Sequence, residues 1–150
     1  MRDSPPCGRI AAVLTGPALM LAGTLPALTA PPLVRAARPP RVIVWRVTTL
    51  DAGGHIAHVF GPGSKIQLRM QWIVRGAAPG ARQTTTWTVF YARKVILRVT
   101  KTSAARNGNW SRTTTVTVTH TPNVGTHIFR GSVSVDGVSS ARSVAFTVRR

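Results

Sequence analysis

The sequence predicts an all-β protein made of two packed antiparallel sheets, and three observations support this. From residue 41 onward, apolar and polar residues alternate with a period of two, which is typical of strands with one buried face. Thr and Val dominate these runs, and branching at Cβ suits a pleated strand. Gly, Pro, Asn and Asp fall between the runs, where turns belong, and no window has a convincing helical face.

Seven alternating runs are expected to form the strands. In chain order they cover residues 43–47, 66–72, 86–91, 94–100, 115–119, 129–135 and 144–148. Turn residues separate several of these runs at 61–63, 76–80 and 107–109. Asp136-Gly137 lies between the last two runs and indicates a tight hairpin, because Asp-Gly suits a turn with positive φ. About seven strands at this spacing are typical of a sandwich.

The apolar face of each run is expected to fill the space between the sheets, as a sandwich requires. The expected inward residues are Trp45, Leu68, Trp72, Trp87, Val89, Leu97, Val116, Val118, Phe129, Val133, Val135, Val144 and Phe146. Residues 41–150 are enough for one core and leave no room for a second domain.

The first 30 residues are expected to be a secretory signal peptide. Arg2 and Arg9 provide a charged start, residues 10–28 are apolar or small apart from two Thr, and Ala30 is a small residue suited to cleavage. The alternative is an uncleaved N-terminal anchor, because Pro31 follows Ala30 and is expected to hinder cleavage. The apolar run only just reaches the roughly 20 residues that a spanning helix needs.

Residues 31–40 are expected to be a Pro/Arg-rich linker, because they begin and end with paired prolines, which favour extended geometry. The predicted domains are therefore 1–30, 31–40 and 41–150. The single cysteine, Cys7, lies in the leader, so the exported part would have no disulfide and no thiolate ligand. These features predict an extracytoplasmic protein, secreted or at the cell surface.

Four stretches carry a family resemblance: FGPGSKIQLRMQW, TTTWTVFY, TPNVGTHIFRGSVSVDG and SSARSVAFTV. They resemble the second, third, sixth and last strands of bacterial immunoglobulin-like or fibronectin type III-like domains, with Trp87 as the core tryptophan. His127 stands at the corner position where that family often has a tyrosine that bonds back to the backbone. The resemblance implies an immunoglobulin-like antiparallel sandwich after the signal segment and an extracytoplasmic setting, but no ligand-binding residues.

Enzymatic activity is not expected, because acid–base catalysis needs positioned carboxylates or histidines. After residue 30 the only carboxylates are Asp51 and Asp136, and Asp136 is assigned to the hairpin turn. Asp51, His55 and His58 form the densest polar cluster, and two His with an Asp can ligate a transition metal. The Gly53-Gly54 pair instead favours a polar loop between two strands. No cofactor or metal site is therefore predicted, and a metal-dependent enzyme stays as the weakest alternative.

Charge is the strongest functional signal: 20 Lys or Arg face three Asp and no Glu, for a formal net charge of +17. Such an excess favours association with polyanions. The tightest basic group is Arg93, Lys94, Arg98 and Lys101, and equal strand parity predicts that Lys94 and Arg98 share one face with Thr100. Outward or loop positions are expected for Arg112, Arg130 and Arg142. Two other causes remain open: a GC-rich genome, or an acidic habitat in which few carboxylates limit pH-dependent unfolding.

The sequence therefore predicts a non-enzymatic exported immunoglobulin-like module with a binding or structural role, secreted or at the cell surface. The alternative is a basic protein that binds polyanions such as extracellular nucleic acid, wall polymer or acidic polysaccharide. Candidate partners are anionic polymers or another cell-surface protein, with a membrane only if the N-terminal segment stays uncleaved.

Overall fold

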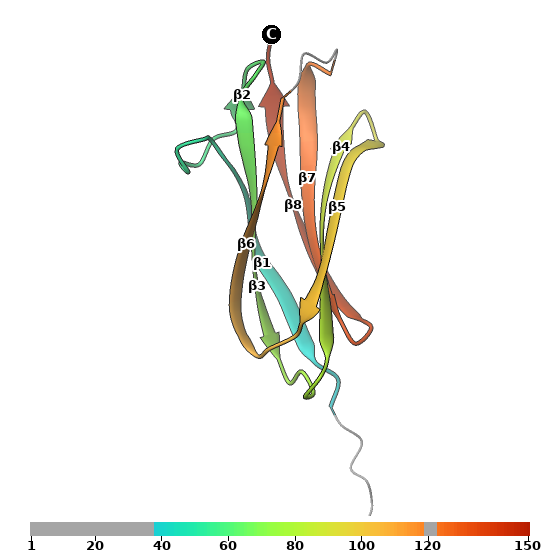
Figure 1. Cartoon of the computed structure of the whole chain (residues 1–150). Coiled ribbons are helices and arrows are strands. Elements are labelled where there is room, and N and C mark those ends of the chain that lie inside the picture. Colours follow the sequence, from blue (N-terminus) through green and yellow to red (C-terminus); the bar gives the residue numbers. More distant parts are fainter. Residues whose placement is uncertain (1–37, 119–122) are drawn as a thin grey trace, which may run out of the picture. The chain divides into compact units, whose positions relative to one another are not determined.

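The computed structural model describes residues 38–118 and 123–150, which belong to one compact unit that spans Ala36–Arg150. The predicted leader at 1–30 and most of the predicted linker at 31–40 lie outside the described residues. The described part contains eight strands and no helix, so no helix in it could cross a membrane (Figure 1). The predicted all-β fold with two sheets is confirmed.

The strands form two sheets. The three-stranded sheet has the order β1-β3-β6, with β1 at Arg41–Leu50, β3 at Lys65–Arg75 and β6 at Gly108–Thr117. The five-stranded sheet has the order β2-β8-β7-β4-β5, with β2 at Val59–Phe60, β8 at Val138–Val148, β7 at Gly125–Val135, β4 at Arg82–Tyr91 and β5 at Lys94–Ala104. Neighbouring strands are antiparallel, except that β2 runs parallel to β8. Figure 1 shows the two sheets as facing layers.

All seven expected strands are present, but β2 was not predicted. Its two residues are too few to show an alternating pattern, and it forms because the backbone of β8 is available beside it. The Thr147 N–H donates to the His58 carbonyl at 2.7 Å, and the Arg149 N–H donates to the Phe60 carbonyl at 2.9 Å. Tertiary pairing, not local preference, therefore creates this strand.

The core between the sheets contains most of the residues expected there. Eight of the expected residues are fully or nearly buried: Leu68, Trp72, Trp87, Val89, Phe129, Val133, Val135 and Phe146. Four more are partly buried and pack against this core: Leu97, Val116, Val118 and Val144. The prediction for Trp45 is wrong, because its side chain is 40% exposed. The register of β1 shifts between Val44 and Arg46, so Val44 and Val47 point inward on either side of the shift.

Two hairpin turns have left-handed residues at both central positions. Asp136 and Gly137 have φ values of 47° and 81° between β7 and β8, which confirms the predicted hairpin. Ala92 and Arg93 have φ values of 46° and 66° between β4 and β5, although neither is a residue that favours this conformation. The second turn therefore carries a backbone cost that the first largely avoids.

Two arginines form hydrogen bonds between the two sheets at the margins of the sandwich, although loop or outward positions were expected for them. Arg142 pairs in register with the buried Gly131 and donates to the Trp45 carbonyl of β1. On the opposite side, Arg112 pairs with the buried Met70 and its Nη2 donates to Ser103 Oγ of β5 at 3.2 Å. Both lie in inward rows at the margin of a sheet, where a long apolar stem lets the guanidinium reach the edge.

Arg130 keeps its expected outward position, because it is exposed on β7 and pairs in register with Thr88 of β4.

Candidate functional site

The four basic residues singled out in the sequence lie along one edge of the five-stranded sheet. Arg93 is at the tip of the β4–β5 hairpin, and Lys94, Arg98 and Lys101 follow on β5, which is the last strand of its sheet. All four side chains are exposed. They form an exposed basic edge, but the strand register shows that they do not form one stripe.

Lys94 and Arg98 lie on opposite faces of β5, so the prediction that they share a face is wrong. Lys94 pairs with Tyr91 and Arg98 pairs with Thr88 on β4. Because these partners are three residues apart on a strand that pairs regularly with β7, their side chains point to opposite sides. The parity of β5 changes at Ile96, which has no partner in the register.

The outward face of the three-stranded sheet gathers a larger basic set, called here the basic face. It comprises Arg41 and Arg46 from β1 and Lys65, Arg69 and Arg75 from β3. Even-numbered residues of β3 are buried in the core, so its odd-numbered residues point outward. The antiparallel register then places the two β1 arginines on the same side.

The basic face brings like charges close together. Arg41 pairs directly with Arg75, and Arg46 pairs with Gln71, which makes it a diagonal neighbour of Arg69. Successive outward rungs along a strand are roughly 7 Å apart. Like charges directly opposite in a sheet destabilise it, so this arrangement opposes folding unless an anion lies against it.

Neutral polar side chains complete the same face. The outward residues of β6 are Asn109, Ser111, Thr113, Thr115 and Thr117, and they pair in register with the odd-numbered residues of β3. Hydroxyl and amide groups can donate hydrogen bonds to anionic oxygens beside the cations. The face therefore offers both charge and donors over the width of three strands.

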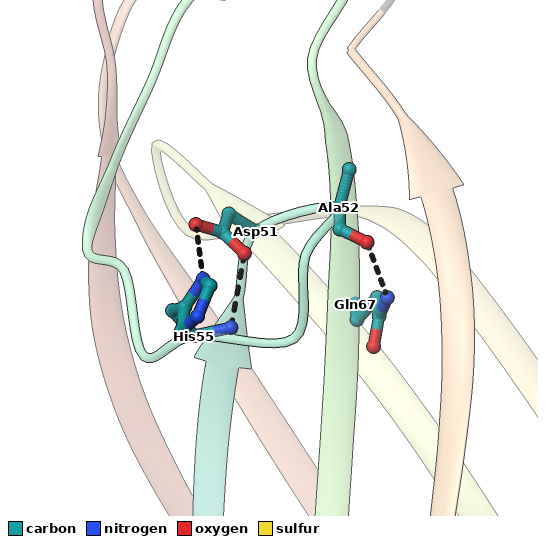
Figure 2. A network of polar contacts seen from close by, with 4 residues as sticks. All are labelled: Asp51, Ala52, His55 and Gln67. Carbon is teal, nitrogen blue, oxygen red and sulfur yellow. Dashed lines mark hydrogen bonds and ion pairs between the residues drawn. The ribbon is translucent and has the colours of Figure 1, made fainter.

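A loop with one of the two described carboxylates stands at the end of the basic face. The His55 N–H donates to Asp51 Oδ1 at 3.0 Å, and His55 Nδ1 is 3.5 Å from Asp51 Oδ2 (Figure 2). The loop is tied to β3 because Gln67 Nε2 donates to the Ala52 carbonyl at 3.4 Å (Figure 2). The hydrogen bond from the His55 backbone lowers the pKa of Asp51, so the carboxylate stays charged and engaged within its own loop.

The possible metal ligands in this loop do not converge. His58 Nδ1 lies 3.5 Å from the hydroxyl of Thr49, whereas His55 contacts Asp51. Among residues 38–118 and 123–150, no three His, Cys, Asp or Glu side chains form a group that could hold a metal ion. The polar loop interpretation of the Asp51, His55 and His58 cluster therefore fits the geometry better than the metal alternative.

His127 is 3% exposed and belongs to a stack of aromatic rings. Its ring centroid is 4.8 Å from that of Tyr91 and 5.2 Å from that of Phe146, and its Nδ1 is 3.0 Å from the Gly125 carbonyl. Tyr91 Oη donates to the Val124 carbonyl at 3.0 Å. Both residues thus brace the backbone that leads into β7, which is a structural task.

The basic face was missed because its members come from two strands that pair only in the fold. One signal was available: Arg69 lies in the predicted run 66–72, and Lys65 and Arg75 have the same parity just outside its two ends. No protein-family model matches this chain, and no curated protein is similar enough to count as a match. The candidate site therefore depends on geometry and charge.

Proposed function

We propose that this chain is an exported, non-catalytic module of immunoglobulin-like type that binds polyanions through its basic face. One observation carries the proposal: five cations share the outward face of one sheet and no Asp lies among them. The two Asp side chains of the described residues lie elsewhere, in the loop after β1 and in the β7–β8 turn. Because Arg41 and Arg75 are direct neighbours, a bound anion would relieve a repulsion that folding creates.

Binding of this kind reads charge and not base sequence. Lys and Arg that neutralise phosphates release counterions, so the affinity falls steeply with salt. A pleated sheet with scattered arginines offers no helix that enters a groove, and contacts to the backbone carry no sequence information. Nucleic acid, wall polymer and acidic polysaccharide therefore share the relevant chemistry.

Export is part of the proposal, because the charged start and apolar run of residues 1–30 match a leader. Mass spectrometry of the native protein should find an N-terminus between Ala22 and Pro39. Intact protein in the cytosol would contradict export, and intact protein in membranes would favour the uncleaved anchor.

The binding test is a salt titration with two matched variants. The wild type and the quadruple variant Arg41→Gln, Arg46→Gln, Arg69→Gln, Arg75→Gln are titrated with labelled duplex DNA and with labelled heparin by fluorescence anisotropy. Four lost phosphate contacts should flatten the slope of log K against log salt on duplex DNA by about 3.6, at about 0.9 per contact. Circular dichroism checks that the fold is retained.

The matched control carries Gln at Arg93, Lys94, Arg98 and Lys101 instead. Each variant loses four positive charges, so both have a formal net charge of 17 − 4 = +13. The control should keep most of the wild-type slope, because its cations are divided between two faces. Equal effects of the two variants would assign binding to total charge, and no binding by the wild type at about 50 mM salt would leave a structural role only.

A further inference from the structure

We infer that the free edge of β6 binds an extended acidic peptide segment of a partner protein as an added strand. This inference concerns a surface other than the basic face and goes beyond polyanion binding. Two independent features support it: an edge strand that lacks the usual protection, and a cation and cavity on the inward side of that edge.

The hydrogen bonds of Val118, the residue after β6, show which residues of β6 turn their backbone N–H and C=O groups away from β3. Val118 donates to the Ser64 carbonyl and accepts from Gly63, both at 2.9 Å, so its backbone groups point toward β3. Antiparallel strands alternate these directions, so odd-numbered residues such as Thr113 and Thr115 turn N–H and C=O toward the open edge. β6 is the last strand of its sheet.

Among the described residues, the edges of β5 and β1 are protected, whereas the edge of β6 carries no such protection. β5 carries three exposed cations and an irregularity at Ile96, which are common means of blocking strand addition. The edge of β1 is occupied, because the Val44 N–H donates to Ser140 Oγ at 3.0 Å and Arg142 contacts the Trp45 carbonyl. β6 has an unbroken register with β3 from Gly108 to Thr117, no proline and one charged residue.

That one charged residue, Arg112, points inward and is half-buried. Its guanidinium donates to the neutral hydroxyl of Ser103, and in the described part of the chain it has no carboxylate partner. Thr114 lies two positions after Arg112 in the same inward row. Its Oγ1 atom is buried and has no hydrogen-bond partner among the described residues. A half-buried cation without a carboxylate partner favours an acidic side chain at this edge.

An apolar cavity lies further along the same row. It has a volume of about 210 Å³ and is lined by Val116 of β6, by Ile96 and Leu97 of β5 and by Phe146 of β8, among others. A strand added to β6 would place alternate side chains on this inward side. Because Arg112 and Val116 are four residues apart, the partner segment would carry an acidic and an apolar side chain at the same spacing.

Charge opposes a second copy of this chain as the occupant. An isologous β6–β6 pairing would bring the inward Arg112 of each copy into the same new interface. It would also join the basic faces of the two copies into one continuous sheet surface. The five cations of one copy would then repel the five cations of the other. A nucleic acid or polysaccharide cannot supply the alternating peptide N–H and C=O groups that a strand edge binds.

The test uses the full-length protein and a labelled peptide in which Thr and Val alternate. One Val of this peptide is replaced by Asp, four residues after another Val, to match the spacing of Val116 and Arg112. Fluorescence anisotropy should show saturable binding, weakened about tenfold when Asn replaces this Asp, because a charge-assisted hydrogen bond is lost. In the Arg112→Gln variant the Asp and Asn peptides should bind equally. The quadruple variant of the basic face should bind the peptide as the wild type does.

Proline substitutions on the two free edges provide a matched pair. Thr113→Pro removes an N–H that faces the open edge of β6, and Thr100→Pro removes one that faces the open edge of β5. In β5 the even-numbered residues face that edge, because the Ala105 N–H bonds to the Ala81 carbonyl on the side of β4. Thr113→Pro should weaken peptide binding about tenfold or more and Thr100→Pro about twofold or less. Thermal melting checks that both variants fold, and N-methylation of alternate peptide residues gives a second readout that leaves the protein unchanged.

One N-methylated series should abolish binding and the other should retain it, since only alternate peptide N–H groups face β6. Several results would overturn the inference: no peptide binding by the wild type, equal losses in the two proline variants, or equal effects of the two methylated series. A concentration-dependent dimer in sedimentation that Thr113→Pro abolishes would assign the edge to a second copy, and would also overturn it.

Discussion

Trp72 Nε1 donates a hydrogen bond across the sandwich to Gln83 Oε1 at 3.2 Å, and both side chains are fully buried. The amide nitrogen of Gln83 donates in turn to Ser103 Oγ at 3.2 Å, and Ser103 also accepts from Arg112. A line of polar contacts thus runs from the centre of the core to the margin between β5 and β6. Because its buried groups are paired, it links the two sheets in one relative position.

Gln83→Leu should destabilise the protein by about 1–3 kcal/mol, because it leaves the buried Trp72 N–H without an acceptor. Urea unfolding measures the loss. The double variant Trp72→Phe, Gln83→Leu should lose less than the sum of the two single variants, since each single change already breaks the bond. Strictly additive losses would show that the bond contributes no coupling.

Trp87 and Trp45 should respond very differently to truncation, although the sequence placed both in the core. Trp87→Ala should cost about 3–5 kcal/mol, because the ring is fully buried. Trp45→Ala should change stability by about 0.5 kcal/mol or less, because this side chain lies on the surface at the β1 irregularity. Comparable losses in chemical denaturation would contradict the assigned orientations.

Gly131 allows the two sheets to approach closely. A Cβ atom at this position would lie 2.7 Å from Met70 Sδ and 2.9 Å from Val47 Cγ1, both from the opposite sheet. Gly131→Ala should therefore destabilise the protein by about 1–3 kcal/mol through overpacking.

Two variants control for this explanation. Adding Val47→Ala to Gly131→Ala should recover part of the loss, because it removes one of the clashing methyl groups. Gly61→Ala should be nearly neutral, at about 0.5 kcal/mol or less, since a Cβ there meets nothing within 4 Å. A Gly131→Ala protein as stable as the wild type would mean that the sheets separate without cost.

The β4–β5 turn should be open to stabilisation. Ala92→Asn with Arg93→Gly places residues that favour positive φ at 46° and 66°, and should stabilise the protein by roughly 0.5–1 kcal/mol in urea unfolding. Asp136→Asn in the β7–β8 turn is the matched control and should change little, since Asp-Gly already suits that turn. A destabilised turn variant would indicate that the Arg93 side chain contributes more than the backbone strain costs.

Local patterns predicted the strands well, because alternation and turn residues are properties of short segments. The β7–β8 hairpin and twelve of the thirteen inward positions followed from these patterns, eight of them buried and four partly buried. Side-chain direction failed at Trp45 and at Lys94, where one extra residue in a strand reverses the parity. Such irregularities depend on the partner strand and not on the run itself, so alternation could not reveal them.

By itself, the sequence determined an all-β chain, its excess of positive charge and the near absence of carboxylates that could neutralise it. Only the tertiary structure decided which cations lie together. Arg41 and Arg75 are 34 positions apart and become neighbours because β1 and β3 pair in one register. Arg112, expected at an outward or loop position, points inward because it pairs in register with the buried Met70, and its place on the edge strand β6 leaves it half-buried. The physical reason is that strand pairing joins residues distant in sequence, and the side-chain row that faces the core is set by register between strands.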